Sequence, residues 1–406
     1  MKRRDLIKYL SVAPIAGAAV GTGVPLQSLA ASAATAAKRD VIKELGLRTF
    51  INAAGTYTTM TASLMHDEVV ATIADSAKHF VMINEVQDKV GEKIAAICHA
   101  ESAMVTAGCW SALVLGTAGV LTGMDRKKVA ALPNVSGLER NEVIVQKSHM
   151  VGYVHALMNT GIIPVEVETA EELERAITSK TAMMYFLNHE TNAGKILHEE
   201  FIAIARKHKI PTLIDIAADI PPVENLWKYT DLGFDLVCIS GGKGIRGPQS
   251  AGLLIGRKDL IAAARLSAPP NGGNIGRGMK VNKEEILGMY VALDKYVNQD
   301  HDAEWKMWEE RVAVIENAAK KVDGVKVNVS VPPIANHTPK ITISWDPDKL
   351  KITSNQLRKN LQDGSPSIEV MIEPNAINIT VFMLKNGEDK IVARRVQEEL
   401  KKAANS

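Results

Sequence analysis

One lysine stands among glycines in the segment ISGGKGIRGPQSAGLLIGR, residues 239–257. It is Lys243, and the apolar run before it, Leu236–Ile239, is typical of a buried β-strand. Ser240 can donate a hydroxyl hydrogen bond to a phosphate, and the glycine pair 241–242 lets the chain bend without strain. The amine of Lys243 can condense with an aldehyde if burial and nearby cations lower its pKa. A solvated lysine in a turn is the alternative, and it is common for any single lysine.

Small residues also follow the apolar run 103–105, in the segment TAGCWS, residues 106–111. We expect this segment to open a helix, where Gly108 and Cys109 would bring backbone N–H groups to an anion at the positive end of the helix dipole. The segment is therefore a candidate phosphate cradle. Small residues at a strand-to-helix turn are also ordinary without any ligand.

A histidine and an aspartate follow two further β-like runs. His149 comes shortly after residues 142–146 and could stack on a flat ring, or it could be a structural histidine held by hydrogen bonds. Asp215 ends the apolar run Thr212–Ile214, where a carboxylate is costly unless it has a cationic partner. A protonated pyridine nitrogen would supply that cation, and small Ala217 would leave room for the ring. A helix cap is the alternative interpretation of the aspartate.

β-like runs and helix-like segments alternate through this part of the chain. The runs are 103–105, 142–146, 163–167, 181–187, 212–216, 236–239 and 252–255, with helix-like segments such as 111–121, 170–178 and 199–207 between them. This alternation predicts an α/β fold with a mostly parallel sheet and helices on both faces. Ligands of such sheets bind at the carboxyl ends of the strands, so the candidate residues are expected to meet at one edge.

The alternation ends at residues 269–273, PPNGG, and a long helical stretch from 283 to about 322 follows. Four more β-like runs and two helices after it predict a small α+β domain. The β-like runs are 325–329, 340–344, 368–372 and 377–381, and the helices are 354–362 and 388–403. We therefore expect an amino-terminal segment 40–80, a large domain 81–282, and linking helices with a small carboxy-terminal α+β domain over 283–406.

The candidate residues form one ordered set: a small-residue turn, a histidine, an aspartate with alanine two residues on, and a lysine one strand later. This order is typical of a fold-type I enzyme with an aspartate aminotransferase-like fold and pyridoxal 5'-phosphate as cofactor. No metal site is expected. Cys98, Cys109 and Cys238 lie in apolar or helix-like surroundings, which favours buried free thiols over disulfides or metal ligands.

The chain also resembles a known family over about residues 40–400. SGGKGIRGPQSAGLLIGR is similar to the lysine region of the bacterial selenocysteine synthase-like proteins, which are related to L-seryl-tRNA(Sec) selenium transferase and include D-glucosaminate-6-phosphate ammonia-lyase-type enzymes. INAAGTYTTMTASLM resembles their amino-terminal segment, and NIGRGMKVNKEEILGMYVAL the segment after the lysine domain. Met60–Ser63 departs from the family, which often has a glycine pair there. Because residues before 40 resemble an export signal, we expect no counterpart of the tRNA-binding amino-terminal domain of true selenocysteine synthases.

The resemblance implies roles for individual residues. Lys243 would carry the internal aldimine, Asp215 would contact the pyridine nitrogen, and His149 would lie against the ring. It also implies a homodimer or higher homo-oligomer with active sites at the subunit interface. The residues that it suggests for phosphate are Gly108, Cys109 and Ser240, and those near a neighbour's cofactor are Thr56, Tyr57, Thr58 and the region of Arg277.

These features predict an enzyme acting at the α- and β-carbons of a small amino acid or amino-sugar acid, with ammonia-releasing elimination first among the reactions. Selenium transferase-type β-replacement and transamination share the first steps and stay open, as does a non-catalytic binder of pyridoxal phosphate or a metabolite. Arg277 is the first candidate for a substrate carboxylate or phosphate, because the guanidinium fork suits such anions. Arg246 is the second candidate, or it only fixes the lysine loop.

The amino terminus is typical of a twin-arginine export signal over residues 1–33, with Arg3-Arg4, a small-residue apolar run and Ala31-Ser32-Ala33 as a cleavage option. Its removal would change the formal charge from +2 to about −1, which disfavours nucleic-acid partners. We expect a periplasmic or otherwise exported protein with no stable membrane association after cleavage. The 406 residues are 46% hydrophobic and only 4% aromatic, which suits aliphatic helix-on-sheet packing.

Overall fold

A computed structural model describes residues 39–404 of the chain, which divides into two units, Met1–Arg48 and Thr49–Ser406. The described part of the first unit holds one short helix, α1 (Val41–Glu44), whose N-cap Asp40 accepts a hydrogen bond from the Lys43 N–H. The expected export signal lies outside the described residues. Between residues 39 and 404, none of the helices combines the length and the apolar character that crossing a bilayer requires.

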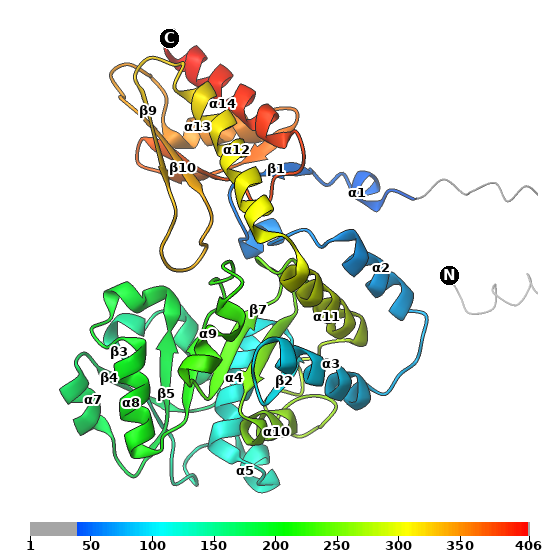
Figure 1. The fold of residues 1–406 in the computed structure, drawn as a ribbon, viewed down its shortest axis with the longest axis vertical. Helices are drawn as coiled ribbons and strands as arrows, with labels where there is room; N and C mark the ends of the chain where they lie inside the picture. Colours follow the sequence, from blue (N-terminus) through cyan, green and yellow to red (C-terminus); the bar gives the residue numbers. More distant parts are fainter. Residues whose placement is uncertain (1–38, 405–406) are drawn as a thin grey trace, which may run out of the picture. The chain divides into compact units, whose positions relative to one another are not determined.

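The second unit is built on a seven-stranded sheet, drawn mainly in cyan and green in Figure 1. The strand order is β2 (Ser102–Thr106), β8 (Gly252–Gly256), β7 (Leu236–Ser240), β6 (Thr212–Asp215), β5 (Thr181–Leu187), β3 (Glu142–Gln146) and β4 (Ile163–Val167). β8 runs antiparallel to both of its neighbours, β2 and β7, and all the other neighbouring pairs are parallel. The predicted mostly parallel sheet is therefore confirmed, and the predicted strands match within one residue at each end.

Helices cover both faces of this sheet because alternate residues of each strand point to opposite sides. On one face, Ile144, Phe186 and Ile214 pack in an apolar core with α3 (Ile83–Ile97), α8 (His198–His208), α9 (Asn225–Leu232) and α11 (Lys283–Asn298). On the other face, Val145, Tyr185 and Leu213 pack with α4 (Gly108–Thr122), α6 (His155–Met158) and α10 (Lys258–Leu266). The remaining helices of this region are α2 (Asp67–Ser76), α5 (Arg126–Ala131) and α7 (Ala170–Ala176).

The predicted long helical stretch after residue 283 is two helices. It breaks at Gln299–Asp300 between α11 and α12 (His301–Ala319), where the Asp300 side chain accepts a hydrogen bond from the Ala303 N–H and so caps α12. The small domain follows, with a four-stranded antiparallel sheet in the order β12 (Met371–Glu373), β13 (Ala376–Thr380), β10 (Lys340–Trp345) and β9 (Val325–Ser330). Its other helices are α13 (Ser354–Gln362) and α14 (Glu388–Ala404).

The predicted strand 368–372 is divided between two sheets. Its first part, β11 (Ser367–Glu369), pairs in parallel with β1 (Phe50–Asn52), and its second part, β12, pairs with β13. Ile51 and Ala53 belong to the apolar core of the small domain. The pairing of Phe50 with Ser367 therefore makes residues 50–53 part of the small domain, and local sequence patterns do not reveal a contact between positions so far apart in the chain.

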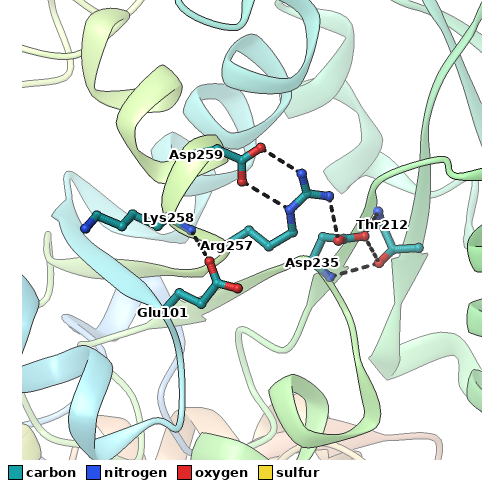
Figure 2. Close-up of polar contacts among 6 residues, drawn as sticks. All are labelled: Glu101, Thr212, Asp235, Arg257, Lys258 and Asp259. Atoms are coloured by element: carbon teal, nitrogen blue, oxygen red, sulfur yellow. Dashed lines mark hydrogen bonds and ion pairs between the residues drawn. The ribbon is translucent and has the colours of Figure 1, made fainter.

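A polar network joins three strands of the large sheet at the ends opposite to those that carry the candidate residues. Figure 2 shows the contacts of this network. Arg257 donates one hydrogen bond to Asp235, at 3.0 Å, and a pair to Asp259, at 2.7 and 3.1 Å. The second oxygen of Asp235 accepts from the N–H and the hydroxyl of Thr212. The network joins Thr212, the first residue of β6, to Asp235, just before β7, and to Arg257, just after β8. It therefore holds together the strand that ends in Asp215 and the two strands that flank the lysine loop.

Candidate active site

The carboxyl ends of the parallel strands open into a cavity of about 690 Å³. The volume lies in the range typical of small-molecule sites. Asp215 and Ala217 from the end of β6 and Lys243 from the loop after β7 all line it. The structure therefore brings together the predicted lysine, aspartate and alanine from adjacent strands, whose register pairs Asp215 with Cys238.

Asp215 is only 3% exposed and forms no ion pair within residues 39–404. Its Oδ1 accepts a hydrogen bond from the Ala217 N–H at 2.9 Å and lies 3.6 Å from the Cys109 sulfur, while the Tyr185 hydroxyl lies 3.5 Å from Oδ2. Burial raises the pKa of Asp215, and the Ala217 N–H and the Lys243 ammonium oppose that rise. These contacts offset only part of the cost of burying the Asp215 carboxylate. A cation beside Asp215 would therefore be stabilised.

The glycines of the lysine loop are required by close packing. A Cβ on Gly241 would lie 2.9 Å from the Ala251 carbonyl oxygen, and one on Gly242 would lie 2.5 Å from the Gln249 Cα. A Cβ on Gly244 would meet the Ile220 carbonyl oxygen. Gly241 and Gly242 are buried, so the loop is a compact support that holds Lys243 against the cavity.

The turn before α4 has the form expected for an anion cradle. Gly108 has φ +82°, which favours glycine, and it begins a 15-residue helix whose first N–H groups have no intrahelical partner. β8 lies directly beneath this turn, since a Cβ on Gly252 would lie 2.5 Å from the Gly108 carbonyl carbon and 2.6 Å from the Cys109 nitrogen. Ser240 pairs with Gly252 in the sheet, at the end of β7. Gly108, Cys109 and Ser240 thus meet around the Gly252 backbone.

Comparisons with known proteins agree with this geometry. The aminotransferase class-V family model matches residues 157–286, which include β6, β7 and Lys243. The D-glucosaminate-6-phosphate ammonia lyase of Salmonella typhimurium (strain 14028s / SGSC 2262) is 26% identical over 380 residues, 90% of this chain and 99% of that protein. The 5'-C-glycyluridine monooxygenase-decarboxylase of a Streptomyces species is 26% identical over 381 residues, 88% of this chain and 91% of that protein.

The L-seryl-tRNA(Sec) selenium transferase of Caldanaerobacter subterraneus subsp. tengcongensis is 24% identical over 283 residues, 63% of this chain and 58% of that protein. Among solved structures, D-glucosaminate-6-phosphate ammonia-lyase superimposes with a TM-score of 0.78 at 25% identity, covering 90% of this chain and all of that one. SPT with its pyridoxal-phosphate internal aldimine has a TM-score of 0.56 at 13% identity, covering 86% and 87% of the two chains, and shares the fold. The chain is a pyridoxal-phosphate enzyme with the type I fold, and it is similar to the selenocysteine synthase-like proteins.

The residues of this enzyme fit pyridoxal phosphate. The turn before α4 packs directly on β8 because Gly252 has no Cβ, and the first N–H groups of α4, which have no intrahelical partner, suit a phosphate. The buried Asp215 carboxylate is placed to hold a pyridine N–H, and the small side chain of Ala217 leaves room on one side of a ring. Lys243 supplies the amine that the aldehyde requires.

His149 does not occupy the position expected for a ring-stacking residue, and that interpretation is corrected. Its side chain is 0% exposed and does not line the cavity. Its Nδ1 accepts a hydrogen bond from the Leu187 N–H at 3.1 Å, and its ring contacts Phe186 edge-on at 4.6 Å. Burial lowers the pKa of His149 to about 4, so the ring is neutral at pH 7. It acts as the hydrogen-bonded structural histidine that was the alternative.

Thr56, Tyr57 and Thr58 line the same cavity as Lys243 within one chain. The Asn52 side chain accepts hydrogen bonds from the Ala54 and Gly55 N–H groups, both at 3.0 Å, and turns the chain toward the cavity after β1. The family resemblance placed these three residues near a neighbour's cofactor. In the protomer they already belong to the cavity that holds its own lysine.

The two arginine candidates lie away from the cavity lining. Arg277 is exposed in the turns before α11, and the protomer does not bring it to Lys243. The Arg246 Nε donates to the Leu64 carbonyl oxygen at 2.8 Å, and burial lowers the pKa of its guanidinium. This contact supports the alternative interpretation, in which Arg246 fixes the lysine loop, and its role as a substrate ligand stays a prediction.

Met60–Ser63, which lacks the glycine pair common in the similar family, has an unusual backbone conformation. Thr61 and Ala62 have φ +61° and +57°, a conformation that glycine adopts most easily and that is rare for a β-branched residue. The Ser63 hydroxyl then donates to the Gly242 carbonyl oxygen at 2.8 Å. This segment therefore clamps the lysine loop although it has no glycine pair.

Sequence patterns missed the small-domain side of the cavity. Lys340, Glu373, Asn378 and Thr380 all line it, from β10, β12 and β13. Asp219, four residues after Asp215, is also buried beside the cavity and accepts hydrogen bonds from Asn188 and from the small-domain loop at Ala335. Alternation of polar with apolar residues in 340–344 and 376–380 was the available signal for a polar sheet face.

Proposed function

We propose that this enzyme catalyses an ammonia-releasing elimination on a 2-amino-3-hydroxy acid, with an amino-sugar acid as the preferred class of substrate. The observation that supports the proposal is the shared cavity of Lys243 and Asp215, which is large enough for the cofactor and a substrate together. One relative, matched over 90% of this chain, is an ammonia lyase of a phosphorylated amino-sugar acid by its name. The chain spans 99% of that protein.

Pyridoxal phosphate, when bound, supplies a ring that stabilises negative charge at the α-carbon of the substrate. Asp215 keeps the proton at the pyridine nitrogen, because a carboxylate buried at 3% exposure attracts an adjacent cation strongly. Ala217 leaves the ring face accessible, and the N–H groups at the start of α4 hold the phosphate.

Lys243 acts as the proton carrier in this proposal. Its Nζ takes the proton from the α-carbon, and the same ammonium returns a proton to the hydroxyl that leaves the β-carbon. The Cα–H and Cβ–O bonds break, and water departs. The resulting enamine tautomerises and is hydrolysed by one water molecule, which gives a 2-keto-3-deoxy acid and ammonia.

Two other reactions remain in view as outcomes of the test. β-Replacement of the selenium transferase kind would need a charged tRNA, and the chain spans 58% of the matched transferase. The Streptomyces relative is an oxygenase and decarboxylase by its name, and an oxidative reaction would consume oxygen and release carbon dioxide.

The test is incubation of the holoenzyme with a panel of 2-amino-3-hydroxy acids, in parallel with Lys243→Ala. We expect equal amounts of keto acid and ammonia from the native enzyme, no oxygen uptake, and no product from the variant. Oxygen uptake with carbon dioxide release, amino-group transfer to a keto acid, or binding without any product would each overturn the proposal in favour of a named alternative.

A further inference from the structure

The side of the cavity opposite the large sheet is a polar face of the small-domain sheet. Its strands place apolar residues such as Ile341 and Ile379 in the core below α12 and α14. Alternate residues face the other way, and β-pairing sets Lys340 opposite Thr380 and Thr342 opposite Asn378. We call Lys340, Glu373, Asn378 and Thr380, which line the cavity, the small-domain wall.

One carboxylate organises this wall. The Glu373 Oε1 accepts a hydrogen bond from the Asn378 amide at 2.5 Å and lies 3.4 Å from the Lys340 Nζ. The side-chain oxygen Oδ1 of Asn378 accepts in turn from the Thr342 hydroxyl at 2.7 Å. These contacts hold Glu373 and Lys340 in place. The Asn378 hydrogen bond, followed by the Lys340 charge, lowers the pKa of Glu373, so it is ionised at neutral pH.

Hydrogen-bonding capacity remains at the wall after these contacts are made. Among residues 39–404, the Glu373 Oε2 accepts no hydrogen bond, and the Lys340 Nζ has N–H groups beyond the one aimed at Glu373. The Thr380 hydroxyl is buried and has no hydrogen-bond partner within the described chain. An acceptor, a donor and a group that can do both therefore lie on one surface, which is the set that neighbouring hydroxyl groups require.

The charges of the cavity disfavour a phosphate at this wall. Lys340 is already paired with Glu373, so a phosphate held by Lys340 would lie beside a carboxylate. No arginine lines the cavity within residues 39–404, although the guanidinium fork is the group best suited to a phosphate. The charged side chains of the lining are Glu190, Asp215, Asp219 and Glu373 against Lys243 and Lys340.

We propose that the small-domain wall binds the hydroxyl groups of a polyhydroxylated substrate tail that carries no phosphate. The ionised Glu373 accepts from one hydroxyl, Lys340 donates to another, and Thr380 completes the set. The inference rests on the proposed function for the reacting end of the substrate, and it assigns the class of the distal end.

The test uses the holoenzyme and three probes: D-glucosaminate, its 6-phosphate, and D-serine, which has the same amino-acid head without a tail. Binding is followed by the change in cofactor absorption on mixing, and turnover by ammonia release. We expect D-glucosaminate to bind at least tenfold more tightly than its 6-phosphate. Glu373→Gln and Thr380→Val should each weaken D-glucosaminate binding roughly three- to tenfold and change D-serine binding less than twofold.

The matched control is Glu398→Gln on α14, a partly exposed residue whose carboxylate lies near Arg394 on the same helix. It should leave all three affinities unchanged, and thermal unfolding with the cofactor spectrum should report folding of each variant. Equal or tighter binding of the 6-phosphate, equal losses for D-serine, or no binding of D-glucosaminate would overturn the assignment of the wall. Tight, wall-dependent binding without ammonia release would overturn the proposed elimination and leave the wall assignment standing.

Discussion

The carboxylate of Asp219 in the large domain accepts a hydrogen bond from the backbone N–H of Ala335 in the small domain, with an N–O distance of 3.2 Å. The same oxygen accepts from the Asn188 amide at 2.6 Å. Next to this contact, the Asn336 N–H donates to the Ala218 carbonyl oxygen at 2.6 Å. The loop between β9 and β10 is thus joined to the end of β6, and the joint lies at the border of the cavity.

Asp219 should make the stability of the enzyme depend on pH. Burial raises its pKa to about 6, so the folded state keeps the proton over a range in which the unfolded state releases it. Its contribution is therefore present below about pH 4, is lost between about pH 4 and 6, and is absent above. Asp219→Asn keeps the accepting oxygen without the charge. The variant should match the native stability near pH 4 and exceed it by roughly 2 kcal/mol at pH 7.

Denaturant unfolding of both proteins from pH 4 to 7, at saturating cofactor, checks this prediction. The difference between the two free energies of unfolding is the relevant quantity, because other carboxylates titrate equally in both proteins. A difference that stays constant with pH would show that the pKa of Asp219 is the same in the folded and unfolded states, and would contradict the prediction.

The small side chain of Ala217 should be required for the cofactor ring to fit at the end of β6. Ala217→Val places two methyl groups at the cavity lining, where we expect the cofactor ring. Equilibrium dialysis should show cofactor affinity reduced by at least tenfold, with the folded structure retained by circular dichroism. Ala218→Val, at the adjacent residue, is the matched comparison and should have the smaller effect on cofactor affinity.

Gly252 should control the phosphate cradle without touching the phosphate. A Cβ there would overlap the backbone of Gly108 and Cys109, so Gly252→Ala must displace the turn before α4. We expect pyridoxal phosphate affinity to fall by one to two orders of magnitude, with a smaller loss for pyridoxal, which has no phosphate group. Gly137→Ala is the control because nothing lies within 4 Å of the added atom. Equal losses for the two cofactor forms would place the phosphate elsewhere.

His149 should contribute to stability and not to the cofactor spectrum. His149→Leu leaves the buried Leu187 N–H without its acceptor, which costs about 1 to 3 kcal/mol. The absorption band of bound cofactor should keep its position at saturating pyridoxal phosphate. A shifted band with unchanged thermal stability would restore the stacking role that the sequence suggested.

Local patterns predicted the large domain well because most strands there are largely apolar runs followed by a polar or glycine-rich turn. Strands 142–146, 163–167 and 181–187 agree with the structure to the residue. The same logic placed Asp215, Ala217 and Lys243 at one edge, since the ends of parallel strands must meet there.

The misplaced residues are those whose roles depend on side-chain direction or distant pairing. His149 follows the right strand, but its ring turns into the core toward Phe186. Arg246 lies in the lysine loop, yet a carbonyl group 182 residues earlier in the chain holds its side chain. The small-domain wall was missed because its approach to Lys243 depends on how two separately folded sheets pack, which short sequence windows do not contain.

The covalent bond between Lys243 and the cofactor is the central claim, and borohydride reduction of the holoenzyme tests it most directly. Peptide mapping by mass spectrometry should find the reduced pyridoxyl group on Lys243 alone, and the Lys243→Ala protein should remain unlabelled. A label on another lysine, or an unmodified Lys243 in protein that retains bound cofactor, would contradict the account.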